Sequence, residues 1–546
     1  MKKNILTTLL ILFGITFLGG FLRFYKIAAN PPSLNGDEIS FGYSAYSILK
    51  TGRDEFGKFL PLVFKSVGDY KNPVPAYLML LPIKALGLTD FAVRFPNAFF
   101  GTIFIPIFYL FLLYILKDKK LAFVGSFLMA VSAWFIFYSR FAYEPLIGSL
   151  FAFLGIWFYM MFLDGKRWFS LLSAFFLVLT MYTSFAQRFF VPLFIGIVVA
   201  FNIKKLKGNY KWLALFLFTC LLLVSPLIYS TFFQGAGTRL SMVLISNDID
   251  FSRYVLVKYF DSINDLPLLF IFWLKRYLNY IDFDFLFFNG LHMTTYDIFG
   301  LGLLYIFEIP WLILGIFSFI KKQIPHKNIF IIWLLVGIIP DSLTNNQQHG
   351  GRLLHIGPIL LLITTLGLIE FIKWIKTVNY KYLKFLISSL YGLFIIINLI
   401  HAFLVFSVHF PRDRGEYYDE GLKQAVLYIG KHQDDYKEIV FDQRHGVDAP
   451  NMVANPFLYV RFYLKYDPKR YQDETKTLGT DIESPYFKFD KYTFRHIEWG
   501  DDKFKKGVLF VGSPWNLPEK DLKKGELLKK IYLTNGNAAY FIVSPQ

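Results

Sequence analysis

Cysteine is almost absent from this sequence: its 546 residues include one, Cys220, which lies in an apolar stretch. A single cysteine excludes an intrachain disulfide and any metal site built from several thiolates. Charged residues are scarce too, at 18%, whereas hydrophobic residues make up 55% and aromatic residues 20%. An ordinary soluble domain is about 45–50% apolar. Long runs of Phe and Leu that no soluble helix could bury on every side predict a membrane protein.

The basic residues do not indicate a nucleic-acid partner. Lys and Arg outnumber Asp and Glu by 57 to 40, which gives a formal net charge of +17. A nucleic-acid-binding protein concentrates such charge on one face or tail of a soluble domain. Here the lysines lie in short links between apolar runs, as at residues 117–120 and 204–211. This distribution is typical of the cytoplasmic loops of a membrane protein.

Apolar runs of about 20 residues, long enough to cross a bilayer, recur along the chain. We expect about eleven transmembrane helices, at residues 5–24, 91–116, 121–138, 142–163, 168–184, 188–203, 212–233, 298–320, 328–343, 353–373 and 385–407. The first run is longer than the core of a signal peptide, which favours a spanning helix. The basic links all fall on one side if the short, proline-containing segment 73–86 does not span. The prediction is a polytopic α-helical membrane protein with its N-terminus inside and its C-terminus outside.

This orientation places three long polar segments outside, at residues 25–90, 234–297 and 409–546. We predict a membrane domain over residues 1–408 and a small extracytoplasmic α/β domain over residues 409–546. The first segment should contain interfacial helices near residues 38–49 and 75–86. For the tail we predict a helix at 420–431 and strands at 438–441, 508–511 and 540–543. In the second segment, a solvated loop is favoured over a metal site for Asp261, Asp265, Asp282, Asp284 and His292.

Ionisable residues within membrane spans are costly and usually functional. In this chain they gather at the predicted outer ends of the spans: Arg94, Arg140, Glu144, Arg188 and Arg352. A transporter would be expected to place polar groups near the bilayer midplane and to show paired halves. The observed distribution instead favours a site that acts on a lipid headgroup at the membrane surface.

The most informative local pattern is Asn35-Gly36-Asp37-Glu38 at the start of the first outer segment. Asp37 is compatible with a helix N-cap and with a general base that takes a proton from a hydroxyl. Glu38 is compatible with a favourable acid in a first helical turn and with a group that supports Asp37. Lys71 and the outer-end arginines are either anchors for lipid phosphate or a pocket that stabilises a departing phosphate. Their common side of the membrane favours the pocket.

His349 and His355 form a further polar group with Gly350, Gly351 and Arg352. The two histidines are six residues apart with glycines between them, which does not match a helical zinc spacing. We therefore interpret them as hydrogen-bonding loop residues.

The order of these residues resembles a known family. The pattern comprises Asp37-Glu38, Tyr43, Gly52, Asp54 to Gly57, Pro61, Asp69-Tyr70-Lys71, Pro73, Tyr77, Gly87, Val93 to Pro96, Ser139-Arg140 to Glu144, Arg188 to Pro192 and Arg352 to Pro358. It resembles the GT-C superfamily of glycosyltransferases, in the branch of the dolichyl-phosphate-mannose protein mannosyltransferases and the lipid A aminoarabinose transferases. The resemblance is dense over residues 30–200, thinner to residue 370 and weak in the tail.

The resemblance implies many transmembrane helices, a polyprenyl-phosphate sugar donor and transfer with inversion. It also implies that Asp37 is the catalytic aspartate and that Lys71 binds the donor phosphate. Glu38 is predicted as a second catalytic residue beside Asp37. The usual pattern has a lysine or histidine followed directly by prolines, whereas here Asn72 intervenes before Pro73. Further predicted phosphate ligands are Arg352, Arg188 and Arg94; predicted supporting residues are Asp69, Tyr70, Arg140, Glu144, His349 and His355. No cofactor is required, although a divalent cation is compatible with the site.

The predicted function is therefore that of a plasma-membrane glycosyltransferase. Its active site would lie on the outer face, where a sugar passes to a hydroxyl acceptor on a protein, a glycolipid or a cell-envelope glycan. The alternative is a flippase or transporter of lipid-linked sugars. That alternative predicts midplane polar residues and paired halves, neither of which the sequence shows.

Overall fold

The computed structural model describes residues 2–66, 69–233, 245, 266–290, 300–344, 348–478 and 486–546. The chain forms two compact units. The helical unit holds residues 1–25 and 97–405, and the mixed unit holds residues 26–96 and 406–546. The first polar segment thus belongs with the tail, whereas the domain boundaries predicted from the sequence place it with the membrane helices.

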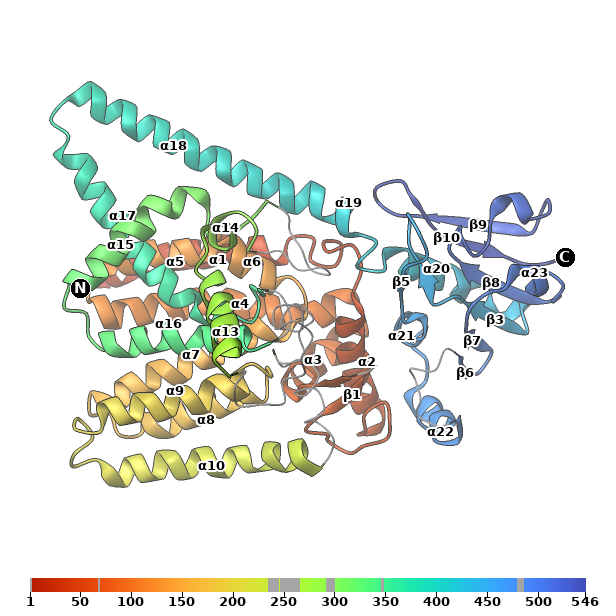
Figure 1. The fold of residues 1–546 in the computed structure, drawn as a ribbon, viewed down its shortest axis with the longest axis horizontal. Helices are drawn as coiled ribbons and strands as arrows, with labels where there is room; N and C mark the ends of the chain where they lie inside the picture. Colours follow the sequence, from red (N-terminus) through yellow and green to blue (C-terminus); the bar gives the residue numbers. More distant parts are fainter. Residues whose placement is uncertain are drawn as a thin grey trace. The chain divides into compact units, whose positions relative to one another are not determined.

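The helical unit consists of long helices that run roughly alongside one another (Figure 1). Its elements are α1 (Lys2–Phe24), α4 (Asp90–Leu116, from Asn97 onward), α5 (Lys119–Val131), α6 (Ala133–Ser139), α7 (Glu144–Leu163), α8 (Phe169–Met181), α9 (Gln187–Asn202), α10 (Tyr210–Phe233), α13 (Leu266–Asn279), α14 (Phe283–Phe287), α15 (Ile309–Lys321), α16 (Lys327–Ser342), α17 (Gly357–Thr377) and α18 (Lys381–Leu404). Each apolar run that the sequence predicts as a span overlaps one or two of these helices.

The chain has the fold of a multi-pass α-helical membrane protein, but the predicted number of eleven spans is not confirmed. In the part of the chain that the structure describes, six helices are long and apolar enough to cross a membrane. A seventh span results if α5 and α6, which meet at a bend of 54°, count as one. Helix α8 has 13 residues. At 1.5 Å per residue it is shorter than a hydrocarbon core of about 30 Å.

Small residues allow helices of this unit to approach closely. A Cβ atom at Gly367 on α17 would lie 1.6 Å from the carbonyl oxygen of Trp311 on α15, and one at Gly315 would lie 2.1 Å from the carbonyl oxygen of Ile363. Backbone contact through glycine is a common way to pack membrane helices, because lipid tails compete with larger apolar side chains.

The mixed unit contains the first polar segment and the tail. Its elements are α2 (Gly36–Thr51), β1 (Phe64–Ser66), β2 (Asp69–Lys71), α3 (Pro73–Leu86), the first turns of α4, α19 (Phe410–Arg414), α20 (Glu420–His432), β3 (Glu438–Phe441), β4 (Arg444–His445), β5 (Met452–Val453), α21 (Pro456–Tyr463), α22 (Pro468–Leu478), β6 (Phe487–Phe489), β7 (Tyr492–Phe494), α23 (Trp499–Asp502), β8 (Val508–Gly512), β9 (Leu527–Tyr532) and β10 (Ala538–Val543). The predicted α/β tail is confirmed, including its helix near residue 420 and its three strands.

The tail is built on a six-stranded sheet of order β6-β7-β3-β8-β10-β9 (Figure 1). Strand β3 lies at the centre and pairs in parallel with β7 and with β8, while the remaining pairs are antiparallel. Strand β8 is buried along its whole length, as the continuous apolar run Val508–Val511 predicts.

Helix α21 of the tail packs against α2 of the first segment. A Cβ atom at Gly42 of α2 would lie 2.9 Å from the ring of Phe462, so only glycine leaves room for this contact. Next to it, Arg461 donates to Glu55 at 2.7 Å, and both side chains are at most 2% exposed. The Arg461 guanidinium also lies 4.4 Å from the centroid of the Tyr471 ring, a cation–π distance. This buried ion pair ties the tail to the first segment.

A second contact between the tail and the first polar segment involves Asp419, which precedes α20. The hydroxyl of Tyr459 lies 2.8 Å from the carbonyl oxygen of Leu34 and 3.0 Å from a carboxyl oxygen of Asp419. Burial, with a smaller contribution from the neighbouring Glu416, raises the pKa of Asp419 from 3.8 to about 7. Burial also lowers the pKa of His445, 3.4 Å from Asp419, to about 4, so that this imidazole is neutral near pH 5.

Replacing Asp419 by Asn should remove part of the pH dependence of stability. Since the folded state keeps the Asp419 proton up to about pH 7 and the unfolded state releases it near pH 4, the wild-type protein should lose stability as pH rises between these values. Asn keeps an oxygen for Tyr459 and tolerates the left-handed backbone of residue 419, whose φ is 49°.

The measurement is thermal unfolding of both detergent-solubilised proteins between pH 4.5 and 7.5. From pH 5 to 7.5 the variant should gain stability relative to the wild type on the order of 2 kcal/mol, since one pKa unit is worth about 1.4 kcal/mol. Parallel pH profiles would show that Asp419 has the same pKa in both states.

Candidate functional site

Helix α2 begins with a capping box. Asn35 is its N-cap: the Asn35 side-chain oxygen accepts the backbone N–H of Glu38 at 2.9 Å, and a Glu38 carboxylate oxygen accepts the backbone N–H of Asn35 at 3.1 Å. Both groups satisfy amides that the first turn of a helix leaves unpaired. Asp37 is therefore not the N-cap, which corrects one of the two interpretations drawn from the sequence.

Glu38 and Arg94 form a fully buried ion pair. The Nε and Nη2 atoms of Arg94 lie 2.8 and 2.9 Å from the two carboxylate oxygens of Glu38. The remaining N–H groups of Arg94 donate to the carbonyl oxygens of Ile27, Pro31 and Ser33. Neither side chain of the pair is exposed. All five guanidinium N–H groups thus have protein acceptors.

This geometry corrects two predictions. Arg94 was expected to bind the donor phosphate, but a phosphate oxygen would have to displace one of its five buried partners. Glu38 was expected to act in catalysis, yet its carboxylate is occupied by Arg94 and by the start of α2. Both residues are buried and fix the conformation of the chain around Asp37. Asp37, one residue before Glu38, is left as the accessible carboxylate of this turn.

Asp37 and Lys71 are paired with each other. The Lys71 ammonium donates to a carboxylate oxygen of Asp37, and the two side chains are 10% and 33% exposed, respectively. Lys71 ends β2, whose hairpin with β1 pairs it with Phe64. The hydroxyl of Ser40, one turn after Asp37 on α2, lies 3.2 Å from that of Ser66 on β1. This contact holds the hairpin against α2.

The other two predicted residues of this segment lie on the same strand. Asp69 and Tyr70 precede Lys71 on β2, where their Cα partners on β1 are Ser66 and Lys65. Because neighbouring residues of a strand point to opposite faces, Tyr70 points away from the side taken by Lys71. The structure thus brings Asp37 and Lys71 together and places the backbone of Asp69 and Tyr70 beside them.

In the helical unit, Arg352 is held by a carboxylate that the sequence analysis missed. Its Nη1 atom lies 3.0 Å from Asp341 Oδ1 and 3.1 Å from the hydroxyl of Thr344. Asp341 also accepts the backbone N–H of His349 at 3.3 Å and is 2% exposed. The available signal was an acidic residue near the end of the apolar run 328–343.

His349 and His355 are bound within the loop between α16 and α17, as predicted. The backbone N–H of Gly351 donates to His349 Nδ1 at 2.9 Å, so that Nε2 carries the proton and faces the Tyr143 hydroxyl at 3.3 Å. His355 Nδ1 lies 3.2 Å from the Gln187 amide nitrogen. These contacts connect the loop to α9 and to the start of α7.

The other charged residues predicted at the outer ends of the spans are Arg140, Glu144 and Arg188. Arg140 donates to the carbonyl oxygen of Leu22 at 2.9 Å and is 3% exposed. Glu144 begins α7 and is also buried. Arg188 lies over the ring of Phe185, 4.2 Å from its centroid, and lines an apolar groove of about 530 Å³ formed by α8, α9 and α10.

Of the acidic residues singled out in the second polar segment, the structure describes Asp282 and Asp284. Asp261, Asp265 and His292 lie outside the described residues. Asp282 caps α14 through the backbone N–H of Phe283, and Asp284 accepts from the Asn289 amide at 2.9 Å. Across the described ranges, no three His, Cys, Asp or Glu side chains are grouped so that they would hold a metal ion.

Part of the chain matches a known family. Residues 14–241 match the family model of the dolichyl-phosphate-mannose-protein mannosyltransferases. The sequence has no significant match among curated proteins.

Two crystal structures of ArnT from Cupriavidus metallidurans share the fold over the whole chain. The apo structure has a TM-score of 0.55 and 10% sequence identity, and the match covers 100% of this chain and 99% of that one. The structure bound to undecaprenyl phosphate has a TM-score of 0.53 and 11% identity, with 100% of both chains covered. These similarities, with the match over residues 14–241, support a glycosyltransferase that uses a lipid-linked sugar. The resemblance predicted from the sequence is thereby confirmed: residues 14–241 match the protein mannosyltransferase family model, and the whole chain shares the fold of ArnT, a GT-C-like fold.

Proposed function

We propose that this protein moves a sugar from a polyprenyl-phosphate donor to a hydroxyl group of an acceptor, with inversion at the anomeric carbon. The acceptor is carried by a protein, a glycolipid or a cell-envelope glycan. We place the reaction, and the mixed unit with it, on the extracytoplasmic side of the plasma membrane.

The observation that carries this proposal is the contrast between two neighbouring carboxylates. Glu38 is unexposed and bound by Arg94, whereas Asp37 is 33% exposed and has the Lys71 ammonium beside it. A general base must be reachable by its substrate, and a phosphate-binding group must carry a positive charge close to the reacting atoms. Asp37 and Lys71 meet these requirements in one place.

In the proposed reaction, the acceptor hydroxyl gives its proton to Asp37 and its oxygen attacks the anomeric carbon from the face opposite the phosphate. The bond between that carbon and the phosphate oxygen breaks, and the bonding electrons leave with the polyprenyl phosphate. Negative charge on the leaving phosphate therefore increases as the bond breaks, and the Lys71 ammonium stabilises it. A phosphate bound to Lys71 also competes with Asp37 for this cation, which frees the carboxylate to accept the proton.

An apolar groove in the helical unit supports a lipid carrier. The groove of about 530 Å³ is lined by aliphatic and aromatic side chains of α8, α9 and α10, together with Arg188. Among the described residues that line it, Arg188 is the one with a charge. A polyprenyl chain is apolar and carries its charge at one end, so the groove suits the chain. The predicted phosphate contacts of Arg188 and Arg352 stay predictions.

The mechanism requires no metal ion for charge neutralisation at the phosphate, since Lys71 supplies a cation. A divalent ion, if bound, would supply the same charge neutralisation. The effect of a chelator on the rate of transfer distinguishes the two cases.

Replacing Asp37 by Asn should abolish most of the transfer activity. Loss of a general base lowers the rate by about 10²–10⁴-fold, while binding of the donor remains. The measurement is transfer of radiolabelled sugar from a panel of polyprenyl-phosphate sugars to membrane acceptors.

Lys71→Met should instead weaken donor binding, because it removes the cation. Asp413→Asn is the matched control, since Asp413 is an exposed carboxylate of the same unit. Equal rates for Asp37→Asn and the wild type would remove Asp37 as the base.

Glu38→Gln tests whether Glu38 has a structural role while Asp37 has the catalytic one. Removing one partner of a buried ion pair leaves the other charge unpaired and typically costs about 3–5 kcal/mol. We therefore expect a large fall in the unfolding temperature of Glu38→Gln and a small change for Asp37→Asn. The double variant Glu38→Leu, Arg94→Met should recover part of the loss, since it removes both charges. A stable Glu38→Gln protein without activity would instead assign Glu38 a direct part in the reaction.

A further inference from the structure

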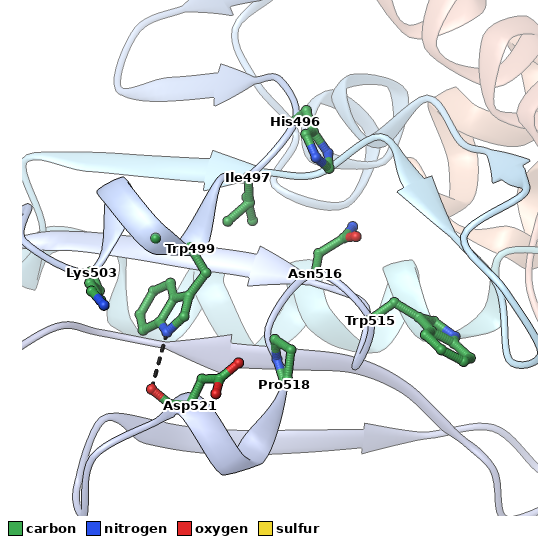
Figure 2. Close-up of a pocket in the computed structure, with 9 residues that line it drawn as sticks. His496, Ile497, Trp499, Lys503, Trp515, Asn516, Pro518 and Asp521 are labelled. Atoms are coloured by element: carbon green, nitrogen blue, oxygen red, sulfur yellow. Dashed lines mark hydrogen bonds between the residues drawn. The ribbon is translucent and has the colours of Figure 1, made fainter.

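A pocket of about 430 Å³ lies in the tail, at the carboxyl ends of its three parallel strands (Figure 2). His496, Ile497 and Trp499 follow β7, while Trp515, Asn516 and Pro518 follow β8. Central strand β3 separates β7 from β8, so the chain crosses it between the two. Because the loops after β7 and β8 leave the sheet on opposite sides of β3, they diverge at its carboxyl edge. This edge is where ligands bind in α/β proteins.

A buried carboxylate organises the rim of this pocket. Asp442, the first residue after β3, is unexposed at its side chain and lies 3.0 Å from His496 Nδ1. It also accepts the backbone N–H groups of Ile497 and Arg444, each at 2.8 Å. Asp442 therefore fixes the His496 imidazole, which is 52% exposed, at the edge of the pocket. A histidine held by a carboxylate in this way presents its other ring nitrogen in a defined direction.

Two tryptophans give the pocket apolar surface. Trp499 is 7% exposed, packs edge-on against Phe510, and donates its indole N–H to the carbonyl oxygen of Asp521 at 3.3 Å (Figure 2). Trp515 is 52% exposed, and its indole N–H donates to the carbonyl oxygen of Val447 at 3.1 Å. Leaving half of a tryptophan in water forfeits hydrophobic stabilisation. A half-exposed ring held in one orientation is typical of a binding surface.

The loop that carries Trp499 is fixed before any ligand binds. Asp502, at the end of α23, receives two hydrogen bonds of 2.8 Å from the guanidinium of Arg495 and one of 2.7 Å from Lys505. It also accepts the backbone N–H of Glu498 at 3.0 Å. A preformed pocket loses little conformational entropy on binding, which favours recognition of a small ligand.

The charges that line the pocket are balanced. Lys503 and Asp521 carry opposite signs, and the imidazole of His496 lies 3.0 Å from the Asp442 carboxylate. Lys503 would attract an anion and Asp521 a cation, so the charges of the lining favour neither sign of ligand. A purely apolar ligand would leave the polar groups without hydrogen bonds. The lining therefore suits a neutral molecule that combines hydroxyl groups with an apolar face.

A sugar ring has this combination, because one of its faces presents C–H groups and its edge presents hydroxyls. The C–H face packs on a tryptophan ring, and the hydroxyls bond to imidazole, amide and carboxylate groups such as those of His496, Asn516 and Asp521. The volume of about 430 Å³ lies within the range of small-molecule sites.

We propose that this pocket binds a neutral saccharide, with its ring stacked on Trp515 and its hydroxyls bonded to His496 and Asp521. We further assign the bound saccharide to the acceptor of the transfer reaction, a glycan; this second step rests on the proposed function. The tail thus holds the acceptor chain as well as bracing the first segment.

The test is saturation-transfer NMR on the full-length protein in detergent micelles, with cellobiose, mannobiose, chitobiose and lactose as probes. At least one disaccharide should bind to the wild type, and Trp515→Ala should weaken its binding about tenfold or more, which corresponds to about 1.4 kcal/mol. Trp515→Phe should retain part of the affinity, since it keeps an aromatic face. Tyr532→Ala is the control, because Tyr532 is a 49% exposed aromatic residue on β9, outside the pocket.

The outcomes separate this inference from the proposed function. Asp37→Asn should bind the disaccharide as the wild type does while its transfer activity is lost. Binding of no disaccharide, or equal binding by the wild type and Trp515→Ala, would overturn the saccharide pocket and leave the role of Asp37 standing. Normal transfer by Asp37→Asn together with Trp515-dependent binding would overturn the proposed catalytic base and leave the pocket standing. A Trp515→Ala protein that binds poorly yet uses every acceptor at the wild-type KM would overturn the assignment to the acceptor.

Discussion

The buried ion pair between Arg94 and Glu38 determines the conformation of the first polar segment. Two buried charges are expensive unless every donor and acceptor finds a partner. Arg94 meets this condition by binding Glu38 together with three carbonyl oxygens of the chain that leads into α2. One side chain of α4 thereby fixes both the entry to α2 and its first turn. Because successive residues of a helix are rotated by about 100°, anchoring Glu38 inward sets the direction of Asp37.

Two other buried carboxylates of the mixed unit also have hydrogen-bonded partners, and the two cases have different roles. Glu55 and Arg461 form a second buried pair, surrounded by aromatic rings. Asp442 is buried as well, yet it serves the half-exposed His496 at a pocket rim. Glu55 and Arg461 are fully enclosed and hold the fold, whereas other pairs of this unit leave one side chain partly exposed. Asp37 with Lys71, and Asp442 with His496, belong to the second kind.

Features that are local in sequence were predictable, and features that depend on distant contacts were not. Apolar runs predicted the helices, and the runs at residues 438–441, 508–511 and 540–543 predicted three strands of the tail. The pattern around Asp37 predicted the carboxylate that the structure leaves accessible. Arg94, 56 residues from Glu38, was assigned to phosphate, because a sequence shows a charge at the end of a span but not its partner. The tail pocket was missed because its residues are spread over two loops that only the sheet brings together.

The ion pair of Glu55 and Arg461 also has a consequence for biosynthesis. The two residues are separated by 406 positions. Translation produces Glu55 early and Arg461 only near the end of the chain, so the core around α2 stays incomplete while the intervening helices are made. Contacts this distant in sequence are the last to form. A chain that terminates prematurely therefore lacks the counter-charge for Glu55, and the first segment matures only in a protein whose synthesis has been completed.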